Sequence, residues 1–158
     1  MTKNLVAYFS ASNVTKGVAN NLAKAIDADI YEIKPLKPYS DNDLNWMDKN
    51  SRSSVEMRDW NSRPEMIEDD FSPDEYNTIY LGFPIWWYIA PTIINTFLER
   101  YDFSNKKIIL FATSGGSRFG RTIENLKPSV DSTTVIIEGG ILNNNPDVET
   151  LKNWAQGL

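Results

Sequence analysis

The chain has 158 residues, a hydrophobic content of 41% and a charged content of 23%, values typical of a globular domain that buries a full core. Its formal net charge of −5 and its lack of any basic run argue against nucleic acid as a partner, because little would displace counterions from the phosphates. The absence of Cys and His excludes disulfides, thiolate catalysis, Ser-His-Asp triads and the common zinc sites. What remains is chemistry by carboxylate, Lys or Tyr, or by a cofactor that brings its own reactivity.

The N-terminal residues Met1–Asn4 lead directly into an apolar run and show no signal-peptide pattern. No apolar stretch approaches the length of a membrane span. We therefore expect a single domain over residues 1–158, without a membrane span and located in the cytoplasm.

The first elements alternate between strand and helix. Residues 3–9 are nearly continuously apolar, which predicts a buried parallel strand. Residues 15–27 predict a helix, because their apolar side chains recur at helical spacing and form one stripe. The stripe consists of Val18, Ala19, Leu22, Ala23 and Ile26. Residues 29–34 alternate more, which favours a strand nearer the edge of the sheet.

Residues 34–72 interrupt this rhythm with a long polar segment that also carries much of the acid. A helix capped near Ser40 or Asp41 is expected here. One face of that helix would be formed by Leu44, Met47 and Val55. A connection this long is either functional or partly flexible. The simpler interpretation is a crossover helix with a solvated acidic face.

The second half of the chain returns to alternation. Residues 77–83 predict a third strand, and Pro91 suits the first turn of a helix that runs to about residue 101. The side chains of this helix that would face the sheet are Ile93, Ile94, Phe97 and Leu98. Residues 107–113 predict a fourth strand. The remaining elements are a short helix over 119–126, a fifth strand over 134–138 and a closing helix over 146–155.

Strands joined by helices, with no hairpin signal, predict an α/β fold with a five-stranded parallel sheet covered by helices on both faces. In such sheets, ligands bind beyond the carboxyl ends of the strands, where the winding direction changes. If the strand order is 2-1-3-4-5, the loops after the first, third and fourth strands are neighbours around one crevice.

The first of these loops is Ser10-Ala-Ser-Asn-Val-Thr15, which joins a strand to a helix. The backbone N–H groups of the first helical turn and the helix dipole make this position suited to an anion. Ser10, Ser12 and Thr15 add hydroxyl donors, and no Lys or Arg lies within the loop, so neutral donors would hold a phosphate. The alternative is an ordinary turn in which Ser12 or Asn13 caps the helix.

The other two loops offer different surfaces. Residues 84–91, Pro-Ile-Trp-Trp-Tyr-Ile-Ala-Pro, present flat aromatic faces that cannot all point into the core. The alternative here is that one aromatic packs under the sheet while another contacts a partner. Residues 113–120, Thr-Ser-Gly-Gly-Ser-Arg-Phe-Gly, contain glycines that let a ligand approach the backbone closely. Together the three loops fit a planar ring system that carries a phosphate tail.

With these loops, the chain resembles the flavodoxin-like FMN proteins over essentially its whole length. Residues 10–15 resemble the flavodoxin phosphate loop, Ser/Thr-x-Thr-Gly-x-Thr. Residues 84–91 resemble the flavin-flanking loop of flavodoxins and related quinone reductases, and residues 113–117 resemble their third flavin loop. The resemblance implies a 2-1-3-4-5 sheet, non-covalent FMN, and transfer of electrons or hydride between a reduced donor and a small-molecule or protein acceptor. Flavodoxin-like reductases often dimerise, so it also suggests a homodimer.

Carried over by position, the resemblance assigns the cofactor contacts. The FMN phosphate would be surrounded by Ser10, Ser12, Asn13, Val14 and Thr15. The isoalloxazine and ribityl chain would be bordered by Pro84, Ile85, Trp86, Trp87 and Tyr88. The other edge of the ring would receive backbone contacts from Thr113, Ser114, Gly115 and Gly116. The sequence leaves open which aromatic residue stacks on the ring. No residue stands out as a catalytic acid or base, and no metal site is expected.

Three residues depart from the family pattern, namely Asn13, Val14, which supplies only a backbone donor, and Arg118. Asn13 replaces the usual Gly, and Asn tolerates left-handed backbone better than other non-glycine residues. Residues 84–91 contain no glycine, which low-potential flavodoxins generally need for a peptide flip beside flavin N5. Arg118 would put a cation near the pyrimidine side of the ring. The missing glycine, the absence of acids from the two flavin loops and the cation of Arg118 favour two-electron chemistry in an NAD(P)H- or quinone-linked reductase.

Other classes remain open at this point. A one-electron flavodoxin shuttle to a redox protein is the first alternative. A non-catalytic flavin-binding or empty interaction module, with Trp46, Trp60 and Trp86 as partner contacts, is the second. A receiver domain would need acids after the first strand, where this chain has Tyr8-Phe-Ser10. A dinucleotide-binding domain would need a different glycine spacing from that of residues 115–120.

Overall fold

The computed structural model describes residues 3–158. Five parallel strands form one sheet in the order β2-β1-β3-β4-β5, which confirms the predicted α/β fold and strand order. The strands are β1 (Lys3–Tyr8), β2 (Asp29–Glu32), β3 (Tyr76–Pro84), β4 (Lys107–Thr113) and β5 (Val135–Ile141). The short strand β2 lies at the edge, as its alternating pattern indicated.

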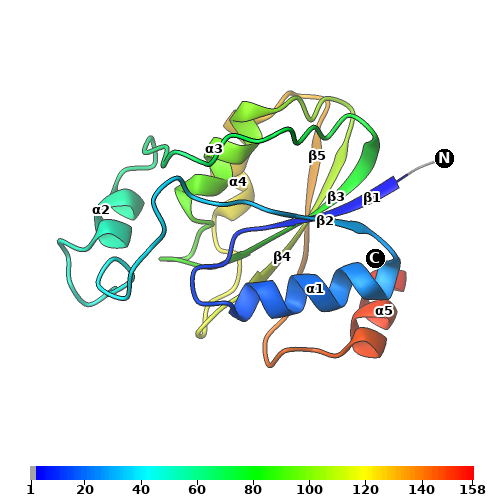
Figure 1. Ribbon diagram of the computed structural model, residues 1–158, viewed down its shortest axis with the longest axis horizontal. Helices are drawn as coiled ribbons and strands as arrows, with labels where there is room; N and C mark the ends of the chain where they lie inside the picture. Colours follow the sequence, from blue (N-terminus) through cyan, green and yellow to red (C-terminus); the bar gives the residue numbers. More distant parts are fainter. Residues whose placement is uncertain (1–2) are drawn as a thin grey trace.

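Helices cover both faces of this sheet. The helices of the described residues are α1 (Val14–Ile26), α2 (Arg52–Arg58), α3 (Thr92–Arg100), α4 (Thr122–Leu126) and α5 (Val148–Gln156), with a short 3-10 helix at Lys127–Ser129; all but α2 cover the sheet. Helices α1 and α5 lie on one face, and α3 and α4 lie on the other (Figure 1). Each face has its own apolar cluster, so the sheet is buried on both sides as a parallel sheet requires.

The predicted helix faces pack as expected. Val18, Ala19 and Leu22 of α1 are fully buried against one face of the sheet. The four apolar residues of α3 predicted to face the sheet are all buried: Ile93, Ile94, Phe97 and Leu98. Because these helices are fixed by buried apolar stripes, the loops that precede them are held in place at one edge of the sheet.

Strand β5 extends beyond its predicted end because its glycines accommodate a neighbouring indole. A Cβ at Gly139 would lie 2.8 Å from the ring of Trp154, and a Cβ at Gly140 would lie 2.9 Å from its Nε1. The two glycines therefore let α5 pack closely on the strand. Helix α4, in contrast, is shorter than predicted and begins at Thr122.

The helix predicted around residues 41–55 is wrong. Turns occupy residues 41–50, and the helix of this segment is α2, which starts after its cap Ser51. Leu44 and Met47 lie outside α2, and Val55 is exposed on it. The buried side of α2 is formed by Ser53, Ser54 and Met57.

Short polar side chains explain the error. Ser40 and Asp43 do form reciprocal hydrogen bonds to each other's backbone N–H, as at a helix start. The Asn45 side chain then accepts from the Met47 N–H, and the Asp48 side chain accepts from the Asn50 N–H. These local bonds compete with helical hydrogen bonds and turn the chain.

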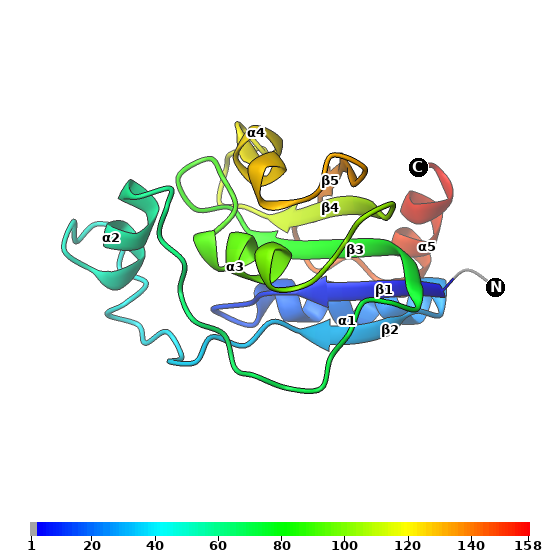
Figure 2. The same cartoon turned by 90° about the horizontal axis from the view of Figure 1, so that it is seen from above.

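The long polar segment after β2 leaves the sheet and returns to it at the same place. Leu36 N–H donates to the Glu65 carbonyl at 2.8 Å, and Ile67 N–H donates to the Lys34 carbonyl at 2.9 Å. Residues 36–65, here named the excursion, are therefore closed at their base. Figure 2 shows α2 beyond the ends toward which the arrows of β1 and β4 point. The excursion thus lies at the carboxyl edge of the sheet, where parallel sheets bind ligands.

Candidate functional site

The first loop, residues 10–15, presents backbone donors at the start of α1. Asn13 adopts the left-handed conformation, with φ 68° and ψ 0°, as the sequence suggested for the residue that replaces glycine. Its side chain does not cap the helix. Within residues 3–158, the amides of residues 11–15 donate to no protein acceptor. The loop therefore offers a set of N–H donors and the positive end of a helix dipole to an anion.

The hydroxyls of the first loop differ in their positions. Ser12 is exposed, whereas Thr15 is buried and its hydroxyl lies 2.8 Å from that of Thr113. The Ser10 hydroxyl accepts from the Lys16 N–H at 3.2 Å. The Thr15–Thr113 bond joins the first loop to the start of the third, so the two are fixed relative to each other.

The second loop, residues 84–91, contains a tight turn. Trp86 N–H donates to the Ile89 carbonyl at 3.0 Å, and Ile89 N–H donates to the Trp86 carbonyl at 3.2 Å. The two central residues, Trp87 and Tyr88, have φ of 50° and 67°. Two positive φ values within such a pair of bonds are typical of a type I′ turn, which normally uses Asn and Gly. Bulky residues there are strained, a feature that clusters at functional sites.

The three adjacent aromatic residues of the second loop differ in how deeply they are buried. Trp86 is half-buried and meets Phe9 and Tyr39 edge-on, with ring centroids 5.7 and 5.5 Å apart. Trp87 and Tyr88 remain exposed at the tip of the turn. One aromatic therefore packs against the core and two stay available to a ligand or a partner.

The third loop, residues 113–120, is held open by hydrogen bonds. The Ser114 hydroxyl accepts from the Ser117 N–H at 2.9 Å and from the Gly116 N–H at 3.3 Å. Asn143 clamps Ser114, because its Oδ1 accepts from the Ser114 N–H and its Nδ2 donates to the Ser114 carbonyl, both at 2.9 Å. A Cβ on Gly115 or Gly116 would meet no atom within 4 Å, so a ligand has room beside this backbone.

The second and third loops are packed together. Ile85 N–H donates to the Thr113 carbonyl at 2.9 Å, and Pro84 is the register partner of Thr113. Farther along, Gly120 has φ 56°, and a Cβ there would lie 2.3 Å from the Tyr88 carbonyl oxygen. Only glycine lets the aromatic turn sit this close to the third loop.

A hollow of about 420 Å³ separates the exposed parts of these two loops. It is lined by Trp46, Ile85, Trp86, Trp87, Tyr88 and residues 114–117. This volume lies within the range of small-molecule sites, and the lining combines aromatic faces with open backbone. Open amides, an aromatic wall and glycines with free space fit a planar ring with a phosphate tail, so the residues present fit FMN.

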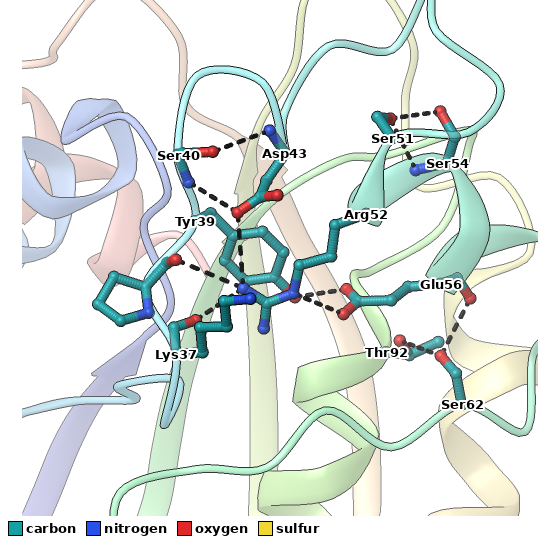
Figure 3. A network of polar contacts seen from close by, with 11 residues as sticks. Lys37, Tyr39, Ser40, Asp43, Ser51, Arg52, Ser54, Glu56, Ser62 and Thr92 are labelled. Carbon is teal, nitrogen blue, oxygen red and sulfur yellow. Dashed lines mark hydrogen bonds and ion pairs between the residues drawn. The ribbon is translucent and has the colours of Figure 1, made fainter.

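The excursion contributes a wall to this site through Trp46, and a polar cluster joins its segments to one another (Figure 3). Arg52 lies over the Tyr39 ring, with its guanidinium carbon 3.8 Å from the ring centroid. It also donates to Glu56 at 3.1 Å and to the Lys37 carbonyl at 2.7 Å. The Tyr39 hydroxyl donates to Glu56 at 2.5 Å. Burial, and then this bond to Glu56, raise the pKa of Tyr39, so its phenol stays protonated as a donor.

Two further bonds tie the return of the excursion to α3. The Ser62 hydroxyl donates to the Glu56 carbonyl and pairs with the Thr92 hydroxyl, 2.8 Å away at the start of α3. Arg63 forms a forked ion pair with Glu99, and this hydrogen-bonded pair lowers the pKa of the Glu99 carboxyl. The polar contacts of Ser62 and Arg63 therefore anchor the excursion to α3, whereas those of Tyr39 and Arg52 join its own segments.

The predicted site residues come together at one edge of the sheet. Arg118 is exposed and makes no ion pair with any described residue. Among residues 3–158, no cluster of acidic side chains is suited to hold a metal ion. No helix in the same range is long and apolar enough to cross a membrane.

Sequence reasoning missed Asn143 and Tyr39. Asn143 follows β5, and the rule that parallel strands end at one edge predicts that this loop lies beside the other three. The run of three asparagines at 143–145 was the available signal. Tyr39 carried no such signal, because its contacts with Phe9 and Trp86 join residues far apart in the chain.

Comparison with known proteins agrees with this geometry. The model of the family described as flavodoxin matches residues 3–158. A protein of Bacteroides uniformis, assigned as a flavoprotein, has 47% identity, a TM-score of 0.91 and 98% coverage of both chains. A similar assigned flavoprotein of Bacteroides eggerthii has 40% identity and a TM-score of 0.90, covering 99% of this chain and 98% of its own.

Two more distant proteins are also similar. A flavoprotein of Lactobacillus acidophilus in complex with FMN shares the fold, with 22% identity, a TM-score of 0.70 and coverage of 98% of this chain and 99% of its own. Rat NAD(P)H dehydrogenase [quinone] 1 is 22% identical over 142 residues, which cover 75% of this chain. The match covers 52% of the rat enzyme, so the chain spans about half the length of this curated relative.

Proposed function

The chain belongs to the flavodoxin family, which supports FMN as its cofactor, and we propose that it is an FMN-dependent oxidoreductase with two-electron chemistry. Bound FMN supplies acceptance and donation of electrons or hydride, and the protein supplies binding and orientation. The donor proposed is NAD(P)H and the acceptor is a small molecule of the quinone class, working in the cytoplasm. The likeness to the rat quinone dehydrogenase supports these classes.

The three loops would divide the work of holding FMN. The amides of residues 11–15 would bind the phosphate without any cationic side chain in the loop. Trp87 and Tyr88 would cover the ring, and the backbone of residues 114–116 would contact its far edge. The Asn143 clamp on Ser114 would fix the direction of the Ser114 backbone.

The turn at residues 86–89 carries the proposal of two-electron chemistry. Flipping the central peptide of a type I′ turn gives a type II′ turn, whose first central position favours glycine. That position is Trp87 here, and a side chain at such backbone angles is strongly disfavoured. The turn therefore resists the peptide flip on which one-electron flavodoxins rely.

The first experiment is an FMN titration of the apoprotein, followed by a redox titration of the loaded protein. We expect tight FMN binding and one wave in which two electrons are transferred together. Trp87→Gly should separate the wave into two one-electron steps, because glycine permits the flip. Tyr88→Gly is the matched control, since the second central residue moves to negative φ in the flip and needs no glycine.

A wild-type titration with two well-separated one-electron waves would favour a shuttle to protein partners and contradict the proposal. Absence of FMN binding would instead favour an interaction module. Anaerobic stopped-flow reduction by NADH or NADPH, followed by a panel of quinones, then tests donor and acceptor. Slow reduction by both nicotinamides would contradict the proposed donor.

A further inference from the structure

A second hollow lies between the excursion and the aromatic turn. Its volume is about 320 Å³. All of its lining residues except Trp87 come from the excursion. The lining residues that matter here are Trp46, Lys49, Met57, Arg58, Trp60 and Trp87.

This hollow adjoins the proposed flavin site. Trp46 and Trp87 line both hollows, so the two share these indole side chains as a common boundary. A molecule in the second hollow would therefore lie directly beside the space assigned to the flavin ring.

The walls of the second hollow consist mainly of aromatic and thioether side chains. Trp46 is 71% exposed, Trp60 is 42% exposed and Trp87 is 43% exposed. Exposed apolar side chains gathered in one place mark ligand or partner sites more often than bare surface. The buried side chain of Met57 lies among them, and thioethers pack well against aromatic rings. These walls favour a flat aromatic molecule.

The charge of the hollow is opposite to that of the protein. The chain carries a formal net charge of −5, yet the charged residues that line the hollow are the cations Lys49 and Arg58. Neither forms an ion pair with a described residue. The neighbouring acids Asp48 and Asp59 accept hydrogen bonds from backbone N–H groups two residues later. The hollow therefore offers two unpaired cations to an anionic group.

The size of the hollow limits the ligand. A volume of about 320 Å³ lies at the lower end of the range for small-molecule sites, which suits one or two fused rings with a small substituent. A whole dinucleotide does not fit this space. The hollow therefore suits a small planar molecule.

We propose that the second hollow binds a planar aromatic anion, such as a quinone that carries a carboxylate or sulfonate group. The role of this hollow as the acceptor site rests on the proposed function, whereas the binding of an aromatic anion there does not. The aromatic walls would hold the ring, and Lys49 and Arg58 would select its negative charge.

Two redox-inert probes of matched shape test the proposal, namely naphthalene-2-sulfonate and its neutral amide, naphthalene-2-sulfonamide. Both are titrated by calorimetry into the FMN-loaded protein and into the apoprotein. We expect the sulfonate to bind about fivefold tighter than the sulfonamide, as for exposed ion pairs. Lys49→Gln and Arg58→Gln should each weaken sulfonate binding about threefold and leave sulfonamide binding unchanged.

Two further variants complete the design. Lys107→Gln removes the same charge at the start of β4, at the opposite edge of the sheet, and should leave both Kd values unchanged. Trp46→Ala should weaken both probes about fivefold or more, because it removes a wall of the hollow. Since Trp46 is largely exposed, this variant keeps the core intact.

Equal affinity for the two probes, or effects of Lys49→Gln and Arg58→Gln no larger than that of Lys107→Gln, would overturn the anion preference. Unchanged binding in Trp46→Ala would overturn the assignment of the hollow as the site. The FMN titration is a separate measurement. If FMN does not bind, the proposed function is contradicted, and the titration of the probes into the apoprotein still tests the anion site.

Discussion

The sheet and the excursion are held together by different forces. The sheet is buried on both faces by apolar clusters, and its loops are fixed by backbone hydrogen bonds such as that from Ile85 to Thr113. The excursion is held by a polar cluster around Arg52 and by the packing of Tyr39 on Trp86. Its Trp46 and Met47 stay exposed. The difference predicts that the excursion opens locally at a lower free energy than the sheet does.

The largest effect is expected in the apolar core between α3 and the sheet. Phe97 is fully buried among the rings of Tyr31, Phe71, Tyr101 and Phe103. Phe97→Ala should lower the free energy of unfolding by about 4 kcal/mol, because a large cavity forms in packed surroundings. Urea denaturation measures this.

Val135→Ala is the control for the core, since Val135 is about half exposed on β5. Its effect should stay within about 0.5 kcal/mol. A similar loss in both variants would show that the sheet does not dominate stability.

The next effect is expected where the aromatic turn meets the third loop. Gly120→Ala places a Cβ 2.3 Å from the Tyr88 carbonyl oxygen at a residue with φ 56°. The free energy of unfolding should fall by about 2 kcal/mol, and FMN affinity should fall with it because the turn must shift. Gly115→Ala, whose Cβ meets nothing within 4 Å, should not change stability measurably. Equal stability of the two variants would contradict the close contact at Gly120.

A smaller and local effect is expected in the excursion. Arg52→Gln removes the guanidinium that contacts Tyr39, Glu56 and the Lys37 carbonyl. Hydrogen exchange in α2 should become about tenfold faster, which corresponds to about 1.4 kcal/mol of local opening, while amides of β3 keep their protection. Lys34→Gln, at the exposed base of the excursion, serves as the charge control. Faster exchange in β3 as well would show that the two regions open as one unit.

Lowering the pH should produce the smallest effect, and it should again affect the excursion before the sheet. The backbone N–H of Ser40 lowers the pKa of Asp43 below its ordinary value of 3.8, and hydrogen bonds from Arg63 and Ser129 lower that of Glu99 below 4.5. A carboxyl whose pKa is lower in the folded state stabilises the protein at any pH above its ordinary pKa. This contribution to stability is lost as the pH falls through the lowered pKa. Exchange in the excursion, corrected for the intrinsic rate, should therefore increase in this acidic range before that of β3 and β4.

Asp43→Asn is the control for the acid effect. Its side chain still accepts a hydrogen bond but does not titrate, so part of the acid dependence should disappear. An unchanged pH profile in this variant would assign the effect to Glu99 and its partner Arg63.

The sequence predicted the elements that depend on apolar periodicity. The stripe of α1, the buried face of α3 and the strand over residues 107–113 were all confirmed, because burial of a regular pattern is a local property of the sequence. The prediction of a helix near residues 41–55 was wrong, since the side chains of Asn45 and Asp48 accept hydrogen bonds from backbone N–H groups two residues later. Such competition between local bonds is not visible in the pattern of apolar residues.

By itself the sequence determined the α/β class and the three loops that meet at one edge, because the direction and order of parallel strands bring those loops together. The tertiary structure decided that Trp86 packs inward while Trp87 and Tyr88 remain exposed, and that Trp46 of the excursion lines the same hollow as these two. Those outcomes depend on contacts between residues far apart in the chain, such as Tyr39 with Trp86 and Asn143 with Ser114. The pattern of residues along the chain does not specify which of these side chains meet, so only the folded structure shows the pairs.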